Sequence, residues 1–147
     1  MQLKNKKITG NISLHGDKSI AHRAIIVASH FPGIHLIKNL PQSNDLIATL
    51  TIFKQYGLKY KMNKNNIKID SRNVSLIKQK INCNESGTTA RLITGYLSGA
   101  NIETIVSAKK SLLKRPMGRI ISPLDSFGVN IKGLNKRLPI QILPSEK

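Results

Sequence analysis

The sequence lacks most of the features that stabilise or anchor proteins outside the cytoplasm. Its 147 residues include one cysteine, Cys83, and no tryptophan. A single cysteine excludes an internal disulfide bond, so we expect a reducing, cytoplasmic location. There is no run of about 18 apolar residues, and we therefore expect no membrane span. The amino-terminal stretch MQLKNKKITG has lysines but no apolar core behind them, so we expect no signal peptide.

Acidic residues are also scarce. Seven acidic side chains stand against 24 basic ones, and the resulting formal net charge of +17 attracts anions in general. Aromatic residues make up only 4%, which leaves few rings for stacking on nucleic-acid bases, and the lysines form no dense block. A basic nucleic-acid-binding module is therefore an alternative that the composition does not favour, while small anionic substrates remain open.

Apolar spacing predicts alternating strands and helices in the first half of the chain. Leu46, Leu50 and Phe53 recur at the spacing of one buried helix face, which Ser43 or Asn44 can cap. The expected elements are a strand containing Ile8, Ile12 and Leu14 that ends at Gly16, a helix over 19–30, a strand over 33–38, a helix that stops at Gly57 and a hairpin over 58–69.

The same order of elements recurs in the second half. YGLKYK at 56–61 lies 71 positions before FGVNIK at 127–132, and at that offset the apolar residues of two helices coincide. A repeat of this length weighs more in a fold prediction than local propensity does. Chance similarity between two amphipathic helices that both end at glycine is the alternative. We therefore predict an α/β (α+β repeat) chain with two βαβαββ units, about 8–70 and about 79–143.

Three basic motifs share one arrangement. In each, a small residue precedes an arginine by four positions: Ser19 and Arg23, Gly87 and Arg91, Ser111 and Arg115. The first two lie where a glycine turn leads into a helix, whose free N–H groups and positive dipole end favour an anion. Simple helix capping with solvated basic side chains is the alternative for any one of them. Two such starts at matching positions of a repeat favour anion binding.

The sequence offers few residues for metal binding, thiol chemistry or acid–base catalysis. The four histidines, at positions 15, 22, 30 and 35, lack the spacing of metal ligands. Cys83 has no evident base partner, so we expect a buried thiol. The sequence contains no paired carboxylates, and we interpret Asp45 as an acidic residue that complements a helix dipole.

The motifs GDKSIAHR, ESGTTARL and KRPMGRIISPLDSFG together resemble the 5-enolpyruvylshikimate-3-phosphate synthase family, also called 3-phosphoshikimate 1-carboxyvinyltransferases. The resemblance implies part of an inside-out α/β barrel made of βαβαββ units. It also implies transfer of the enolpyruvyl group from phosphoenolpyruvate to the 5-hydroxyl of shikimate 3-phosphate, with release of phosphate. The family passes through a tetrahedral adduct and uses no metal or organic cofactor.

The resemblance also assigns residues, position by position. It places Lys18, Ser19 and Arg23 on shikimate 3-phosphate, and Lys18, Gly87 and Arg115 on phosphoenolpyruvate, with Thr88 and Arg91 nearby. A glycine at position 87 would let the backbone approach its ligand closely. The sequence departs from the family pattern at Asn84-Glu85, which puts a carboxylate beside the expected anion site.

Members of the family are considerably longer than this chain. The motifs that carry proton transfer and most of phosphoenolpyruvate binding lie beyond the matched portion. We therefore expect an N-terminal portion with an incomplete domain, half a site, no catalytic residue of its own and little or no activity alone. Its expected partners are the two anionic substrates and its own C-terminal part. A non-catalytic remnant that binds a partner chain is the alternative.

Overall fold

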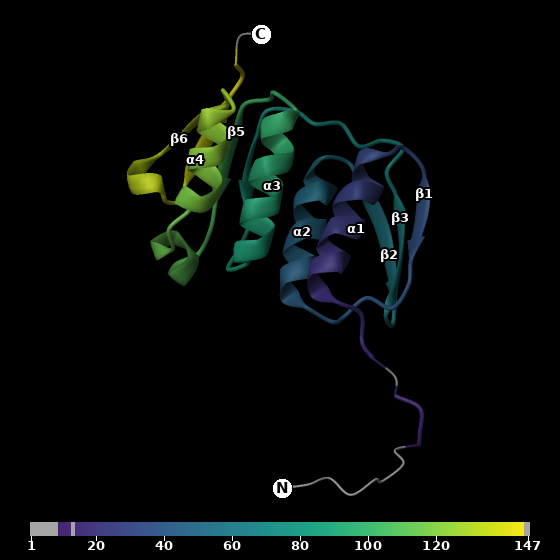
Figure 1. Ribbon diagram of the computed structural model, residues 1–147. Helices are drawn as coiled ribbons and strands as arrows, with labels where there is room; N and C mark the ends of the chain where they lie inside the picture. Colours follow the sequence, from purple (N-terminus) through teal and green to yellow (C-terminus); the bar gives the residue numbers. More distant parts are fainter. Residues whose placement is uncertain (1–8, 13, 146–147) are drawn as a thin grey trace, which may run out of the picture.

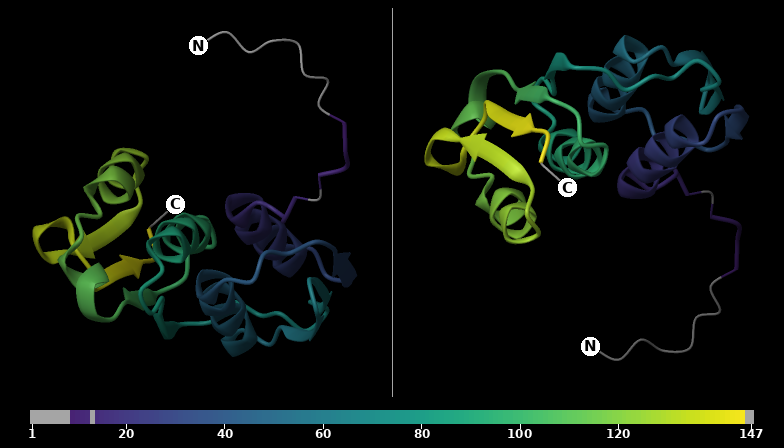
Figure 2. Two further views of the ribbon diagram at one scale, coloured as in Figure 1. Left: turned by 90° about the horizontal axis from the view of Figure 1, so that it is seen from below. Right: turned by 90° about the horizontal axis from the view of Figure 1, so that it is seen from above.

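The computed structural model describes residues 9–12 and 14–145. Two β-sheets lie at opposite sides, and four helices pack against or between them (Figure 1). In the two views of Figure 2, α3 lies between the helices of the first half and the second sheet. None of the helices in the described ranges has the length and apolarity needed to cross a membrane.

The first half contains two helices and an antiparallel sheet. Its elements are α1 (Lys18–His30), β1 (Ile34–Ile37), α2 (Asn44–Gln55), β2 (Lys59–Asn63) and β3 (Asn66–Asp70). The strands have the order β1-β3-β2. The predicted helix that stops at Gly57 is confirmed as α2, and Gly57 has a φ of 98°, a conformation that glycine adopts without strain.

The second half repeats the pattern with one more strand. Its elements are β4 (Gln79–Asn82), α3 (Gly87–Gly99), β5 (Thr104–Ser107), the short 3₁₀ helix η1 (Lys110–Lys114), α4 (Gly118–Ser126), β6 (Asn130–Gly133), the 3₁₀ turn η2 (Leu134–Lys136) and β7 (Ile140–Leu143). The strand order is β4-β5-β7-β6, in which only the β4–β5 pair is parallel.

The two sheets differ by one strand. The order β1-β3-β2 matches β5-β7-β6, but β1 has no neighbour that corresponds to β4. We expected a strand containing Ile8, Ile12 and Leu14. Ile8 lies outside the described residues, and 9–12 and 14–16 are not strand, so that prediction is wrong for the described part. Alternating apolar residues form a strand only against a partner, and here Ile12 and Leu14 are 85% and 76% exposed.

One hydrophobic core runs through both halves. Helix α1 packs on β1 and β3 and also on α2, while α2 contacts α3, and α3 contacts α4 and its own sheet. Phe53 on α2 is fully buried, and its ring meets that of Tyr96 on α3 at 5.5 Å between centroids. The packing therefore holds α1, α2 and α3 next to one another as one layer.

The three helices of this layer begin with side-chain caps. Ser43 accepts from Asp45 N in α2, as the sequence predicted, and Ser86 accepts from Thr89 N in α3. On α1 the cap is Asp17, whose Oδ1 accepts from Ile20 N at 2.7 Å. The preceding turn requires a glycine, because a β-carbon on Gly16 would overlap the carbonyl oxygen of Asn39.

Candidate functional site

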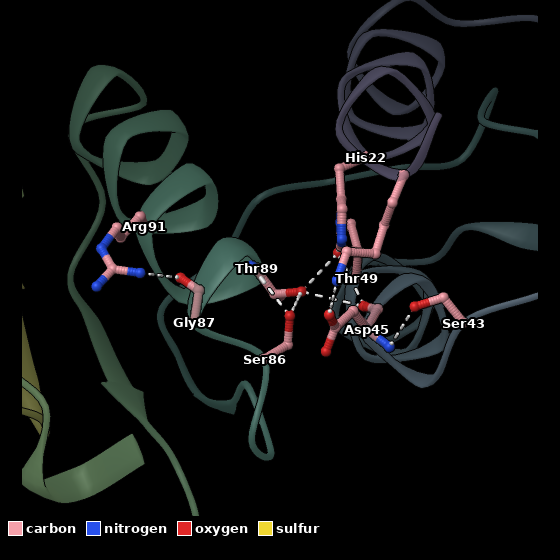
Figure 3. Close-up of polar contacts among 9 residues, drawn as sticks. His22, Ser43, Asp45, Thr49, Ser86, Gly87, Thr89 and Arg91 are labelled. Atoms are coloured by element: carbon pink, nitrogen blue, oxygen red, sulfur yellow. Dashed lines mark hydrogen bonds and ion pairs between the residues drawn. The ribbon is translucent and has the colours of Figure 1, made fainter. Parts of the chain in front are cut away.

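The N-terminal turns of α1, α2 and α3 meet (Figure 3). Lys18 Nζ in the first turn of α1 lies 2.7 Å from Asp45 Oδ2 in the first turn of α2. Thr89 Oγ1 in the first turn of α3 donates to the Asp45 carbonyl oxygen at 3.1 Å. Each helix N-terminus carries partial positive charge and free N–H groups. The fold therefore gathers three positive helix ends at one place.

Asp45 is held as a carboxylate in this cluster. The hydrogen bond from Lys18 lowers the pKa of the Asp45 carboxyl below its ordinary value of 3.8 and outweighs the opposing effect of partial burial. The Ser86 hydroxyl, donating from the start of α3, lowers the same pKa further. The Asp45 carboxylate thus joins the first turns of α1 and α2, while its backbone carbonyl oxygen contacts α3.

We expect an Asp45→Asn substitution to reduce stability at neutral pH and to have no effect in strong acid. A carboxyl whose pKa is lowered by folding stabilises the fold above its ordinary pKa, and this is lost as pH falls through the lowered pKa. The partners are 49% and 31% exposed, so the neutral-pH loss is below about 1 kcal/mol. Thermal melts followed by circular dichroism from pH 2 to 8 would measure it. An equal loss at every pH, or the same profile for Asp125→Asn on α4, would contradict the pairing.

Two arginines flank Gly87 at the start of α3. Arg91 Nη1 donates to the Gly87 carbonyl oxygen at 3.2 Å. A β-carbon on Gly87 would lie 3.0 Å from Arg91 Nη1 and 3.4 Å from Arg115 Nη1. Both guanidinium groups therefore reach the backbone of the residue that directly follows the Ser86 cap. Planar guanidinium groups bind carboxylates and phosphates through two parallel hydrogen bonds.

An open hollow of about 450 Å³ adjoins these helix starts. It is lined by the first turn of α2, the loop before α3 and the residues before η1: Asn44, Asp45, Ile47, Ala48, Asn84, Glu85, Ser86, Lys109 and Lys110. Glu85, the departure from the family motif, pairs with Lys110 at 3.5 Å across it. Asp45 and Ser86 thus belong both to the hollow and to the contacts between the helices.

The structure brings together only some of the predicted site residues. Lys18 pairs with Asp45, whose carbonyl oxygen contacts Thr89 in the first turn of α3, and Arg91 and Arg115 lie at Gly87 in that same turn. Ser19 and Arg23 are exposed on α1, and their side chains form no hydrogen bond within the described part of the chain. Thr88, half-buried as the second residue of α3, forms no side-chain hydrogen bond there either.

Sequence reasoning missed two features of the site. Asp45 was interpreted as a residue that complements the dipole of its own helix, whereas it also pairs with Lys18 on another helix. The signal for this was its rarity, as one of seven acidic residues in the chain. His22, four residues after Lys18 and thus on the same face of α1, is fully buried against Thr49, which no periodicity indicated.

Metal and thiol chemistry find no support in the described ranges. No group of three or more His, Cys, Asp or Glu side chains there is arranged to hold a metal ion. Cys83 is fully buried, as predicted, and burial raises the pKa of its thiol to about 12. A thiol in this environment is inert at neutral pH.

The fold and the cluster define a mixed α/β chain with paired helix-and-sheet halves and a basic site at the helix N-termini. The family model described as EPSP synthase (3-phosphoshikimate 1-carboxyvinyltransferase) matches residues 3–147. This match covers almost the whole sequence, and the chain therefore belongs to that family.

Individual relatives agree with this assignment. The chain is 42% identical over 130 residues to the 3-phosphoshikimate 1-carboxyvinyltransferase of Clostridium tetani, covering 86% of this chain. It is 39% identical over 145 residues to the one from Staphylococcus saprophyticus, covering 96% of this chain. The solved EPSP synthase from Acinetobacter baumannii superposes with a TM-score of 0.80 at 28% identity over 91% of this chain.

The chain spans only part of these relatives. The aligned region is 30% of the Clostridium protein, 34% of the Staphylococcus protein and 32% of the Acinetobacter structure. The predicted partial fold of the family is therefore confirmed, and the family's activity and substrates pass to this chain only as a proposal.

Proposed function

We propose that this chain supplies the cation-rich part of an active site that transfers the enolpyruvyl group of phosphoenolpyruvate to the 5-hydroxyl of shikimate 3-phosphate, releasing phosphate. Its membership of the EPSP synthase family supports this reaction. The observation that carries the proposal is the convergence of Lys18, Arg91 and Arg115 with the N-terminal ends of three helices. Two highly anionic molecules can lie side by side only where fixed positive charge offsets their repulsion.

Within this proposal each cation has a role. Lys18 contacts both substrates, while Ser19 and Arg23 on the exposed face of α1 hold shikimate 3-phosphate. Arg115 binds phosphoenolpyruvate next to the Gly87 backbone, with Thr88 and Arg91 close by. Because Lys18 is held by Asp45 and Arg91 by the Gly87 carbonyl oxygen, these two cations need little reorganisation when an anion binds. No step of the proposed binding requires a metal or an organic cofactor.

The chain consists of two similar structural units and lacks a further part of the site. Residues of about 8–70 and about 79–143 are two copies of one βαβαββ unit, the first without its opening strand in the described residues, and the matching strand orders β1-β3-β2 and β5-β7-β6 support this. The remaining site residues come from a C-terminal part that relatives carry in the same chain. A cytoplasmic location is supported by the single, buried, unpaired Cys83. The nucleic-acid alternative depends on net charge alone and is not proposed.

A pair of glycine substitutions on α3 tests the function. We expect the purified chain to bind phosphoenolpyruvate in the presence of shikimate 3-phosphate, and Gly87→Ala to weaken binding about tenfold or more, because the methyl group displaces two guanidinium groups from the ligand's place. Isothermal titration calorimetry would measure both affinities. Gly95→Ala is the matched control, since its β-carbon would meet only Ile120 at 4.0 Å. Absence of binding by the wild-type chain, or equal affinity in both variants, would refute the proposal.

A further inference from the structure

A carboxylate and an ammonium group face each other across the hollow beside the start of α3. Glu85 Oε2 lies 3.5 Å from Lys110 Nζ, and both residues line the hollow. Glu85 directly precedes the Ser86 cap and is separated from Gly87 by that residue alone, so its negative charge adjoins the candidate anion site. An acidic side chain at this place opposes an anionic ligand, because like charges repel more strongly where water is partly excluded.

Backbone contacts fix the two loops that carry this ion pair. Lys109 N donates to the Asn84 carbonyl oxygen at 2.8 Å, and these residues directly precede Lys110 and Glu85. Lys110 has a φ of 45°, in the left-handed region that is unfavourable for a lysine, so the surrounding contacts must hold it there. The backbone of the two loops therefore sets how close Glu85 and Lys110 lie, and the ion pair itself is not needed to bring them together.

The ion pair between Glu85 and Lys110 is weak enough to open. Its separation of 3.5 Å exceeds the 2.7 Å between Lys18 and Asp45, and its side chains are 78% exposed at Lys110 and 49% exposed at Glu85. Ion pairs this accessible to water contribute little to stability. A multiply charged anion that also contacts the free N–H groups of α3 can therefore take the Lys110 ammonium group from Glu85.

We propose that Glu85 is a positioning residue that engages the Lys110 ammonium group and thereby weakens anion binding at the start of α3. The choice of phosphoenolpyruvate as the anion rests on the proposed function. The effect on inorganic phosphate does not, because it needs only an anion at the N-terminal end of α3 beside Arg91 and Arg115. Glu85 thus makes a bound anion easier to release than a neutral residue at this position would.

The charges that line the hollow balance while Glu85 is ionised. The lining contains two acidic side chains, Asp45 and Glu85, and two basic ones, Lys109 and Lys110. Asp45 is already paired with Lys18 at 2.7 Å, so it does not compete for the lysines of the hollow. A neutral side chain at position 85 leaves the lining with an excess positive charge and leaves Lys110 available to a ligand.

Titrations with inorganic phosphate, followed by NMR, test the role of Glu85. The backbone amide shifts of residues 86–88 report binding at the start of α3 rather than elsewhere on this basic chain. We expect Glu85→Gln to bind phosphate about three- to fivefold more tightly than wild type, and this gain to shrink as the salt concentration rises. Glu103→Gln is the matched control: it removes the same charge from an ion pair with Lys78 at the other end of β5 and should bind phosphate as wild type does.

A Lys110→Met substitution determines whether Glu85 acts through Lys110. In that background the gain from Glu85→Gln should fall below about twofold, because no ammonium group remains to be released. An undiminished gain would overturn the positioning role, since Glu85 would then act on the anion directly. Unchanged or weaker phosphate binding in Glu85→Gln, or no phosphate-dependent shift at residues 86–88 in either protein, would overturn it as well. A disturbed loop would lower affinity, so a gain separates positioning from a merely structural role.

Phosphoenolpyruvate titrations of the same variants separate this inference from the proposed function. With shikimate 3-phosphate present, Glu85→Gln should strengthen phosphoenolpyruvate binding by about the same factor as phosphate binding. If phosphate responds as expected but phosphoenolpyruvate binds no more tightly than phosphate, the proposed function fails and the role of Glu85 stands. If phosphoenolpyruvate binds tightly and equally to wild type and Glu85→Gln, the role of Glu85 fails and the proposed function stands.

Discussion

A Lys18→Met variant will bind phosphoenolpyruvate and shikimate 3-phosphate about 10- to 100-fold more weakly than the wild-type chain. A hydrogen bond from a charged donor contributes about 1.5–3 kcal/mol, and Lys18 is expected to donate to both ligands. Methionine preserves most of the aliphatic side chain, so the packing of α1 is kept. Because Lys18 and its partner Asp45 are partly exposed, the melting temperature should change very little.

A second lysine substitution separates a specific contact from the general effect of net charge. Lys68→Met on β3 removes the same unit charge from an exposed side chain between the buried residues Ile67 and Ile69. The affinity of this variant should remain within about twofold of wild type at physiological salt, where distant charges are screened. Equal losses in the two variants would mean that the chain attracts anions only through its net charge of +17.

A Phe53→Ala variant will lose the largest amount of stability among the substitutions considered. The ring is fully buried between α2 and α3, and it contacts Tyr96 edge-on. Replacing a buried phenylalanine by alanine costs about 3–5 kcal/mol, which for a chain of this size lowers the melting temperature by roughly 10 °C. Because Phe53 joins the helices of the two halves, the variant should also perturb the contacts between Asp45 and Thr89.

Thermal melts and chemical denaturation would measure this loss, with Phe127→Ala as the matched control. Phe127 follows α4 and is 86% exposed, so its removal should change stability by no more than about 0.5 kcal/mol. Similar destabilisation in the two variants would show that the shared core of the two halves is not what holds the chain together.

Much of the fold could be predicted from apolar spacing and turn residues. Helix α2 begins at the Ser43 cap and is followed by Gly57 at positive φ, because both ends are specified by local chemistry. The helices and the hairpin of the first half were predicted to within a few residues for the same reason. The strand expected before Gly16 was wrong in the described part because pairing depends on a neighbouring strand, which local sequence does not reveal.

The site was less predictable than the fold. The motifs identified Lys18, Gly87, Arg91 and Arg115, which the structure connects, but their binding roles remain predictions. The contacts of Asp45 with Lys18 and Thr89, and the buried contact between Thr49 and Thr89, could not be found from spacing, since they depend on three helix starts that are far apart in sequence. Short polar side chains such as Thr49 acquire a role only through the neighbours that packing gives them.

The meeting of helix starts from both halves has a consequence for how such a protein can arise. Lys18 and Asp45 come from the first half, whereas Ser86, Gly87 and Arg115 come from the second. Either half expressed separately would carry an incomplete set of charges and would have to associate with another polypeptide to complete it. Duplication of an ancestral unit within one gene would place both halves in one polypeptide. Assembly of the site would then no longer depend on protein concentration.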